Sequence, residues 1–234
     1  MNNLQPINFQ ILDIHTENFA ELNDISSNDS DEPKKKEDES KYRIIIFGKD
    51  EKETTYTLVV NDFTPYFYIR VPDNFTKDKL KILENWIKEP GPKKDNSYED
   101  KGGGFWSKYH NCLLRLTLHN KLKFRGFNNH KKFKYVRLVF TNTDAMRNCI
   151  NIFQKKTWDS KENKIKKVMP RNIAPIPGIT DYYYKFELHE NMIDPMLRFI
   201  HHRDIKPVGW ITIPSNKYQH LHKFTTSNVN IETR

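Results

Sequence analysis

Cations and aromatic rings are interleaved in two neighbouring stretches of this 234-residue chain, KLKFRGF from Lys121 to Phe127 and HKKFKY from His130 to Tyr135. Lysine and arginine neutralise phosphates, and exposed rings stack on unpaired bases, each stack contributing about 1–3 kcal/mol. Residues of these types in this pattern point to the binding of nucleic acid. We predict phosphate contacts from six cations and base stacking from two rings: Lys121, Lys123, Arg125, Lys131, Lys132 and Lys134, with Phe127 and Tyr135.

The alternative for the rings of this region is burial in a hydrophobic core, which we favour for Phe124, Phe133 and Phe140. Side chains alternate between the two faces of a β-strand. A strand over 135–140 would therefore place Tyr135, Arg137 and Val139 on one face, and Val136, Leu138 and Phe140 on the other. The stretch 134–140 has a loose likeness to the central strand of RNA-recognition folds, but it lacks the glycine spacing of that motif.

The net charge of +9 conceals a strong segregation along the chain. Residues 101–171 hold 18 Lys and Arg against 3 acidic residues, a net of +15, whereas residues 1–40 have a net charge of −7. A concentrated positive field attracts polyanions, of which nucleic acid is the commonest. A solvated, lysine-rich surface remains the alternative, because lysine, asparagine and isoleucine are all frequent in this sequence.

The sequence gives little support for metal binding, a phosphate-binding loop or catalysis. The neighbouring histidines, His201-His202 and His220-x-His222, have no cysteine or carboxylate partner at zinc spacing, and the glycines at 102–104 do not lead into a phosphate-binding G-K-[ST]. We find no G-x-S-x-G, H-E-x-x-H or dinucleotide-binding pattern. We therefore predict no catalytic residue, no metal ligand and no cofactor for this chain.

The cellular setting follows from composition. Two cysteines do not form a disulfide scaffold, the first ten residues do not resemble a signal peptide, and the longest uncharged apolar run, Ile44–Phe47, is far shorter than the roughly 20 residues that span a bilayer. We expect a soluble, intracellular protein without a membrane partner.

The elements that would position these residues form an α+β succession. Helices are expected over 76–88 with Thr76 as N-cap, over 144–153 with Thr143 as N-cap, and over 194–202 with Pro195 in the first turn. Strands are expected over 7–16, 42–47, 54–60, 66–71, 112–118, 135–140, 182–188 and 208–213. We predict a β-rich part over 41–171, a terminal β-α-β unit over 172–213 and a polar tail over 214–234. The acidic residues 24–40 bury too little apolar surface to order themselves, so we predict a mobile insertion.

Longer motifs occur near both ends of the predicted β-rich part. FELHENMIDPMLRFIH, from Phe186 to His201, and DIKPVGWI, from Asp204 to Ile211, are similar to the segment that precedes the exonuclease domain in family B DNA polymerases of the delta type. FTPYFYIRVP, from Phe63 to Pro72, resembles a strand near the start of the same enzymes, and residues 133–153 also fit their pattern. The resemblance is greatest to the polymerases of nucleocytoplasmic large DNA viruses.

This resemblance implies that residues 1–234 are a polymerase N-terminal domain. The domain would be β-rich, with an RNA-recognition-like (ferredoxin-like) β/α module beside the exonuclease and facing the template-primer. Arg198 would fix its helix and Trp210 would be buried. The exonuclease motif D-x-E and the polymerase motifs S-L-Y-P-S and D-T-D do not occur in the chain. We therefore expect nucleotide addition, its magnesium ions and the 3′–5′ exonuclease to lie in the rest of the parent protein.

The implied partners are DNA, as template-primer or single strand, the remaining polymerase domains, and a sliding clamp reached through the parent protein. The implied location is a viral factory in the host cytoplasm, or the nucleus. A rival hypothesis makes the chain a protein-interaction module, in which the acidic residues 24–40 recruit a partner and the basic segment is only solvated surface.

Overall fold

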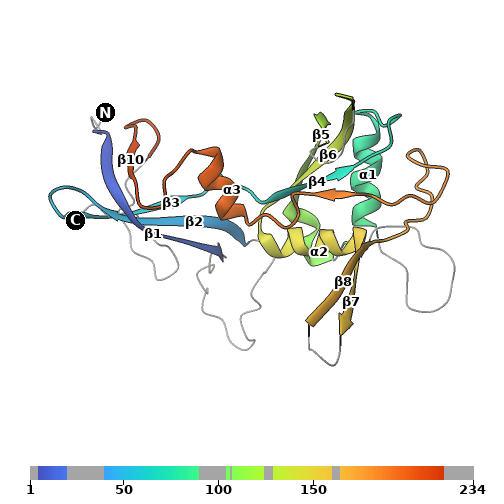
Figure 1. The fold of residues 1–234 in the computed structure, drawn as a ribbon, viewed down its shortest axis with the longest axis horizontal. Helices are drawn as coiled ribbons and strands as arrows, with labels where there is room; N and C mark the ends of the chain where they lie inside the picture. The colour runs from blue at the N-terminus through green and yellow to red at the C-terminus, as the bar shows by residue number, and fades with distance from the viewer. Residues whose placement is uncertain are drawn as a thin grey trace, which may run out of the picture. The chain divides into compact units, whose positions relative to one another are not determined.

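The structure, a computed structural model, describes residues 5–19, 40–89, 104–105, 107–123, 129–159 and 164–218. Antiparallel sheets and three α-helices confirm the predicted α+β class (Figure 1). The chain forms two compact units, and each is described by itself. Unit 1 combines Met1–Thr64 with Ile193–Arg234, and unit 2 is Pro65–Met192.

Unit 1 is built on a four-stranded antiparallel sheet in the order β10-β1-β2-β3. Its strands are β1 (Ile7–Phe19), β2 (Lys41–Lys49), β3 (Thr55–Val60) and β10 (Trp210–Ile213). Alternate side chains of β1 and β2 are buried together, and the core they form also includes Phe199 of α3 (Pro195–His202). The buried strand residues of this core are Phe9, Ile11, Tyr42, Ile44 and Ile46.

Helix α3 confirms the predicted start of that helix, because Pro195 occupies its first turn and Asp194 Oδ1 accepts a hydrogen bond from Met196 N at 2.7 Å. Arg198 is buried on this helix, as expected for a structural residue. The predicted burial of Trp210 is wrong: 48% of its surface is exposed. Side chains alternate between the two faces of β10, so Ile211 and Ile213 face the core while Trp210 points away from it.

Unit 2 follows the order β-α-β-β-α-β, with sheet order β5-β6-β4-β9 and antiparallel pairing throughout. This is the ferredoxin-like arrangement that the resemblance implied. The elements are β4 (Tyr66–Arg70), α1 (Lys79–Lys88), β5 (Leu113–Leu122), β6 (Lys132–Phe140), α2 (Thr143–Phe153) and β9 (Leu188–His189), with a 3₁₀ helix, η2 (Ser107–Cys112), before β5.

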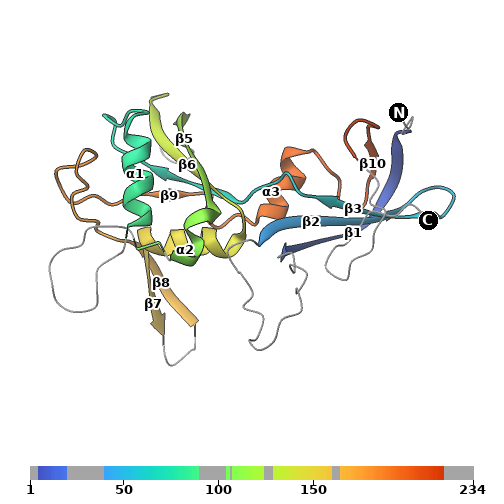
Figure 2. The same cartoon turned by 180° about the vertical axis from the view of Figure 1, so that it is seen from behind.

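A two-stranded ribbon, β7 (Gln154–Asp159) paired with β8 (Lys164–Pro170), is inserted between α2 and β9. Figures 1 and 2 show it projecting away from the four-stranded sheet of the same unit. Strands β7 and β8 therefore form a separate two-stranded sheet and leave the β-α-β-β-α-β core of unit 2 intact.

One face of the unit 2 sheet packs against both helices. The predicted alternation in β6 is confirmed, because Val136, Leu138 and Phe140 are fully buried in this core. They meet Leu83 and Ile87 of α1, together with Cys149 and Phe153 of α2 and Phe67 and Ile69 of β4. Because the helices cover this face, the opposite side chains of β4, β5 and β6 lie on the other one, which we call the outer face.

Several predicted boundaries differ from the structure. Helix α1 begins at Lys79 after a turn that contains Thr76, and its N-cap position is Asp78. Helix α2 is capped by Asn142, whose side chain accepts from Ala145 N, one residue before the predicted cap Thr143. The strand expected over 182–188 is reduced to β9 and an isolated bridge between Ile173 and Tyr184.

The predicted divisions at residues 171 and 213 also differ from the structure. The strand-helix-strand succession β9-α3-β10 is present, but β9 pairs with β4 in unit 2 and β10 pairs with β1 in unit 1. The chain therefore leaves unit 2 after Met192 and returns to the first sheet. This pairing joins residues about 200 positions apart, so no local pattern reveals it. Of the predicted acidic insertion, only Ser40 lies within the described residues.

Candidate nucleic-acid interface

The outer face of the unit 2 sheet aligns aromatic and basic side chains in rows across three strands. In one row Tyr68 of β4 pairs with Arg137 of β6, which pairs with Thr117 of β5. In the next row the same strands align Arg70, Tyr135 and His119. Because alternate residues share a face, the outer face also includes Tyr66, Lys121, Phe133 and Val139.

Four rings form a compact layer on this face. Tyr66, Tyr68, Phe133 and Tyr135 are each less than 10% exposed and cluster with Val139. The rings of Tyr66 and Tyr68 meet edge to face, with centroids 5.7 Å apart. This is the position at which RNA-recognition folds hold the aromatic side chains that stack on bases.

Cations cover three of these rings. The Lys121 ammonium lies 4.0 Å from the centre of the Tyr68 ring and donates a hydrogen bond to its hydroxyl at 2.9 Å. The guanidinium of Arg70 lies 4.4 Å from the centre of the Phe133 ring. That of Arg137 lies 5.3 Å from the centre of the Tyr66 ring. Cation–π contacts hold these positive charges against the aromatic layer.

Two of these cations have an unsatisfied donor. Nε of Arg70 and Nε of Arg137 are both buried, and neither donates a hydrogen bond within the described part of the chain. A buried donor without an acceptor costs about 1–3 kcal/mol. The positive charges that these two arginines bring to the outer face suit an anionic ligand.

Electrostatics on the outer face depend on Glu187, next to β9. Burial raises the pKa of its carboxyl, but hydrogen bonds and charge from Lys123 and Arg70 outweigh burial and lower the pKa overall. Lys123 Nζ lies 3.3 Å, and Arg70 Nη1 3.5 Å, from Glu187 Oε2. One carboxylate therefore faces two cations, and the positive charge is only partly neutralised.

Both histidines of the site favour the neutral form. Burial, with smaller contributions from Arg137 and Lys121, lowers the pKa of His119. Burial is also the largest cause of the lowered pKa of His189, although the charge of Glu187 opposes it. At neutral pH the positive field of the outer face therefore comes from lysine and arginine.

The predicted cations occupy different places. Lys121 lies on the outer face, and Lys123 is just beyond the end of β5 against Glu187.

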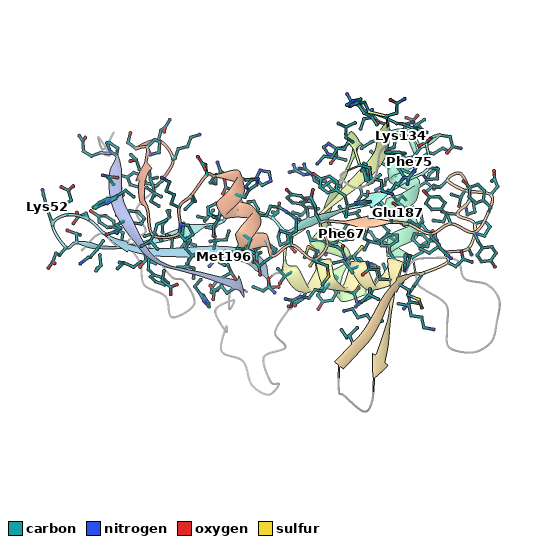
Figure 3. The ribbon with its side chains drawn as sticks, viewed as in Figure 1. Lys52, Phe67, Phe75, Lys134, Glu187 and Met196 are labelled. Atoms are coloured by element: carbon teal, nitrogen blue, oxygen red, sulfur yellow. The ribbon has the colours of Figure 1, made fainter. Side chains whose placement is uncertain are left out.

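The other predicted cations around β6 have different surroundings. Lys131 pairs with Asp73 at 3.3 Å, and both side chains are exposed. Lys134 points away from the outer face and donates to the Phe75 carbonyl at 2.7 Å (Figure 3). Lys132 is exposed at the start of β6.

Of the two rings predicted to stack on bases, only Tyr135 lies within the described residues. Arg125 and Phe127 lie outside the described residues. Tyr135 is only 4% exposed and its ring meets that of His189 edge to face, at 5.0 Å between centroids. Its ring therefore has little open surface on which a base could stack, and burial raises the pKa of its hydroxyl. The preference for core burial holds for Phe133 and Phe140, which are 9% and 0% exposed.

Sequence reasoning missed the residues of β4. Tyr66, Tyr68 and Arg70 alternate with the core residues Phe67 and Ile69 in the stretch YFYIR. That alternation could have marked a strand with an aromatic, basic outer face. What it could not show is that β4 pairs with β6, whose residues lie about 70 positions further along the chain.

The described residues contain neither a metal-binding cluster nor a membrane-spanning helix. Among them, no group of three or more His, Cys, Asp and Glu side chains is placed to hold a metal ion. The magnesium implied by the resemblance is therefore assigned to no residue here. None of the helices in the described ranges is both long and apolar enough to cross a membrane.

Comparison with known proteins found DNA polymerases. The chain is 25% identical over 208 residues to a DNA polymerase of Phaeocystis pouchetii virus, a match that covers 89% of this chain and 18% of the relative. It is 31% identical over 177 residues to that of Pyramimonas orientalis virus, covering 75% and 12%. It is 23% identical over 176 residues to the DNA polymerase delta catalytic subunit of Dictyostelium discoideum, covering 75% and 14%.

These matches span only 12 to 18% of the length of the relatives. The solved family B DNA polymerase of Pyrobaculum calidifontis superposes with a TM-score of 0.47 at 11% identity, covering 87% of this chain and 17% of that one. No family model matches the chain.

Proposed function

We propose that this chain, a homologue of the family B DNA polymerases of viruses and of the delta type, is an N-terminal, non-catalytic part of a replicative polymerase. In this proposal it binds template or single-stranded DNA and supports the exonuclease domain of the parent protein. Nucleotide addition, magnesium binding, the 3′–5′ exonuclease and any contact with a sliding clamp belong to other parts of the parent. Its place of action is the nucleus or a viral factory in the cytoplasm.

The observation that supports DNA binding is the pairing of rings with cations on the outer face. The Lys121 ammonium and the Arg70 and Arg137 guanidinium groups lie within 4.0 to 5.3 Å of ring centres there. When such cations neutralise phosphates, the counterions condensed on the nucleic acid are released, which favours binding.

The direct test is fluorescence titration of the chain with a labelled single-stranded oligonucleotide at several salt concentrations. We expect the binding constant to fall as salt rises, with a log–log slope of about −0.7 for each phosphate neutralised. The variant Arg137→Gln should weaken binding, whereas Lys52→Gln, in the exposed β2–β3 turn of unit 1, should not. Binding without salt dependence, or no binding at low salt, would overturn the proposal.

Deletion of residues 24–40 tests the rival interaction module. Removing this acidic stretch should leave oligonucleotide binding unchanged or increase it, because negative charge repels DNA. If the deletion instead abolished capture of a protein partner, and Arg137→Gln left oligonucleotide binding unchanged, the interaction module would be the better account.

A further inference from the structure

The ribbon of β7 and β8 carries a large part of the basic segment away from the body of unit 2. Its strands of six and seven residues hold five lysines against one aspartate. They are paired from Gln154 with Pro170 to Asp159 with Lys164. At about 3.4 Å per residue the ribbon is about 20 Å long, and Figures 1 and 2 show it projecting from the end of α2.

The base of the ribbon is fastened to the core of unit 2. The backbone N–H of Arg171, just after β8, donates at 2.8 Å to the carbonyl of Phe153, which is fully buried at the end of α2. Arg171 Nε donates to the Gln154 carbonyl at 3.1 Å, so both strands are tied together where they leave the core. Because α2 covers the sheet face opposite to the outer face, the ribbon starts on the other side of unit 2 from the outer face.

The ribbon contributes no buried side chain among those that the structure describes. Ile165, Val168 and Met169 of β8 are each more than a third exposed. An isolated two-stranded hairpin is marginally stable at best in water. Lysines on an edge strand prevent pairing with other chains, but that role does not account for three exposed apolar residues on the same strand. Their combination with lysine indicates a contact surface.

The described lysines of β7 keep their charge available to a partner. Lys155 and Lys156 are exposed, and neither forms an ion pair with another described residue. In contrast, Lys123 pairs with Glu187 at 3.3 Å. A lysine without a carboxylate partner gains more from a phosphate, because no ion pair has to be broken first. Interfaces between proteins are depleted in lysine, so this composition favours nucleic acid over a protein partner.

The shape of the ribbon fits a duplex. The major groove of B-form DNA is about 12 Å wide and admits a two-stranded β-ribbon. Lysines on such a ribbon reach the phosphates at the groove edges, and apolar side chains meet base edges such as the thymine methyl group. We propose that the β7–β8 ribbon binds double-stranded DNA by lying in its major groove, with Lys155 and Lys156 at phosphates. This goes beyond the proposed function, which places single-stranded DNA on the outer face.

The first test compares a short labelled DNA duplex with its single strand, by fluorescence anisotropy at several salt concentrations. The double variant Lys155→Gln, Lys156→Gln should make the log–log salt slope for the duplex less steep by about 1.8, since each phosphate contact contributes about 0.9. Single-strand binding should be almost unchanged. The matched control Lys52→Gln, Lys77→Gln removes the same charge from two other exposed lysines and should leave both slopes as they are.

An RNA duplex of the same sequence tests the groove, because its major groove is too deep and narrow for side chains to read although its charge is the same. We expect the unaltered chain to prefer the DNA duplex. Replacing residues 155–169 by Asn-Gly, a two-residue turn that joins the paired ends Gln154 and Pro170, should abolish this preference. Equal binding of both duplexes by the unaltered chain, or an unchanged duplex slope in the lysine double variant, would overturn the proposal.

Two further outcomes separate this proposal from the others. Loss of binding to anionic lipid vesicles in the lysine double variant, with duplex binding unaffected, would assign the ribbon to a membrane surface and also overturn it. Arg137→Gln should weaken single-strand binding and keep the duplex slope. If the unaltered chain binds the duplex through the ribbon but binds no single strand, the proposed function fails and the ribbon proposal stands; if it binds only the single strand, the reverse holds.

Discussion

The Lys121 ammonium rests on the ring of Tyr68, 4.0 Å from its centre, and donates a hydrogen bond to its hydroxyl at 2.9 Å. The two residues are 53 positions apart and belong to β5 and β4, which both pair with β6. The lysine side chain therefore reaches across the central strand. A flexible cation is thereby held at a defined place on the outer face, where its charge is available to a phosphate.

Replacing Lys121 by glutamine should weaken single-stranded DNA binding at low salt. One phosphate contact would be lost, so the log–log salt slope should become less steep by about 0.7. Tyr68→Phe removes the hydroxyl acceptor but keeps the ring, and should alter the slope less. Titration at four or five salt concentrations measures both, with Lys52→Gln as the surface control. An unchanged slope in Lys121→Gln would show that this ammonium meets no phosphate.

Replacing Asn142 by alanine should destabilise unit 2 by about 1–2 kcal/mol, the upper part of the range for loss of an N-cap. Asn142 is fully buried, and its Oδ1 accepts from Ala145 N at 2.8 Å. The comparison is Thr143→Ala, one residue later, which leaves that hydrogen bond in place. Urea unfolding followed by circular dichroism should show the larger loss for Asn142→Ala. The reverse order would assign the cap to Thr143.

Replacing Gly48 by alanine should destabilise unit 1 by about 1–3 kcal/mol. An added Cβ would lie 2.2 Å from Phe9 Cδ2 and 2.4 Å from the Gln10 carbonyl oxygen. The second of these atoms belongs to the backbone of β1, so a rotamer change cannot relieve the overlap. Urea denaturation should show a lower midpoint for Gly48→Ala and an almost unchanged one for Lys52→Ala. Equal midpoints would mean that β1 moves away from the added Cβ without loss of stability.

Stability should fall as pH decreases below about 6.5. The pKa values of His119 and His189 are lowered in the folded chain, mainly by burial, so the unfolded chain binds more protons in this window. The free energy of unfolding is therefore highest above pH 6.5 and decreases until the pH is below the folded pKa values. Urea midpoints from pH 8 to 5 measure the trend.

The double variant His119→Gln, His189→Gln should have a flatter profile over that range, because it has no imidazole to protonate on the outer face. Glu187 does not interfere in this window. Because the pKa of Glu187 is lowered in the folded chain, its carboxylate stabilises the fold at every pH above the pKa that it has in the unfolded chain. This stabilisation is lost only at a more acidic pH. An equally steep decline in the double variant would place the pH sensitivity elsewhere.

Local sequence patterns predicted most of the elements. The alternation in Lys132–Phe140 predicted the two faces of β6, and Pro195 after Asp194 predicted the start of α3. The resemblance predicted the ferredoxin-like order of unit 2. These features depend on neighbours within a few residues or on motifs read along the chain, so they are visible without the fold.

The candidate site was only partly predictable. Of its cations, Lys121 was predicted from the basic stretch, whereas Arg70 and Arg137 become part of one surface only through the pairing of β4 with β6. Burial was also misjudged: Tyr135 was expected to be open, but His189 from β9 covers it. Ion pairs such as Lys123 with Glu187 join residues 64 positions apart, and no spacing rule predicts them.

The amino-acid sequence by itself determined the α+β class, the basic segment, the start of α3 at Pro195 and the resemblance to family B polymerases. These properties depend on residue type and short-range order. Only the tertiary structure decided that β10 returns to β1, and that the basic residues divide between an outer face and intramolecular ion pairs. These depend on contacts between distant segments, which form only because burial of the two cores brings the strands together.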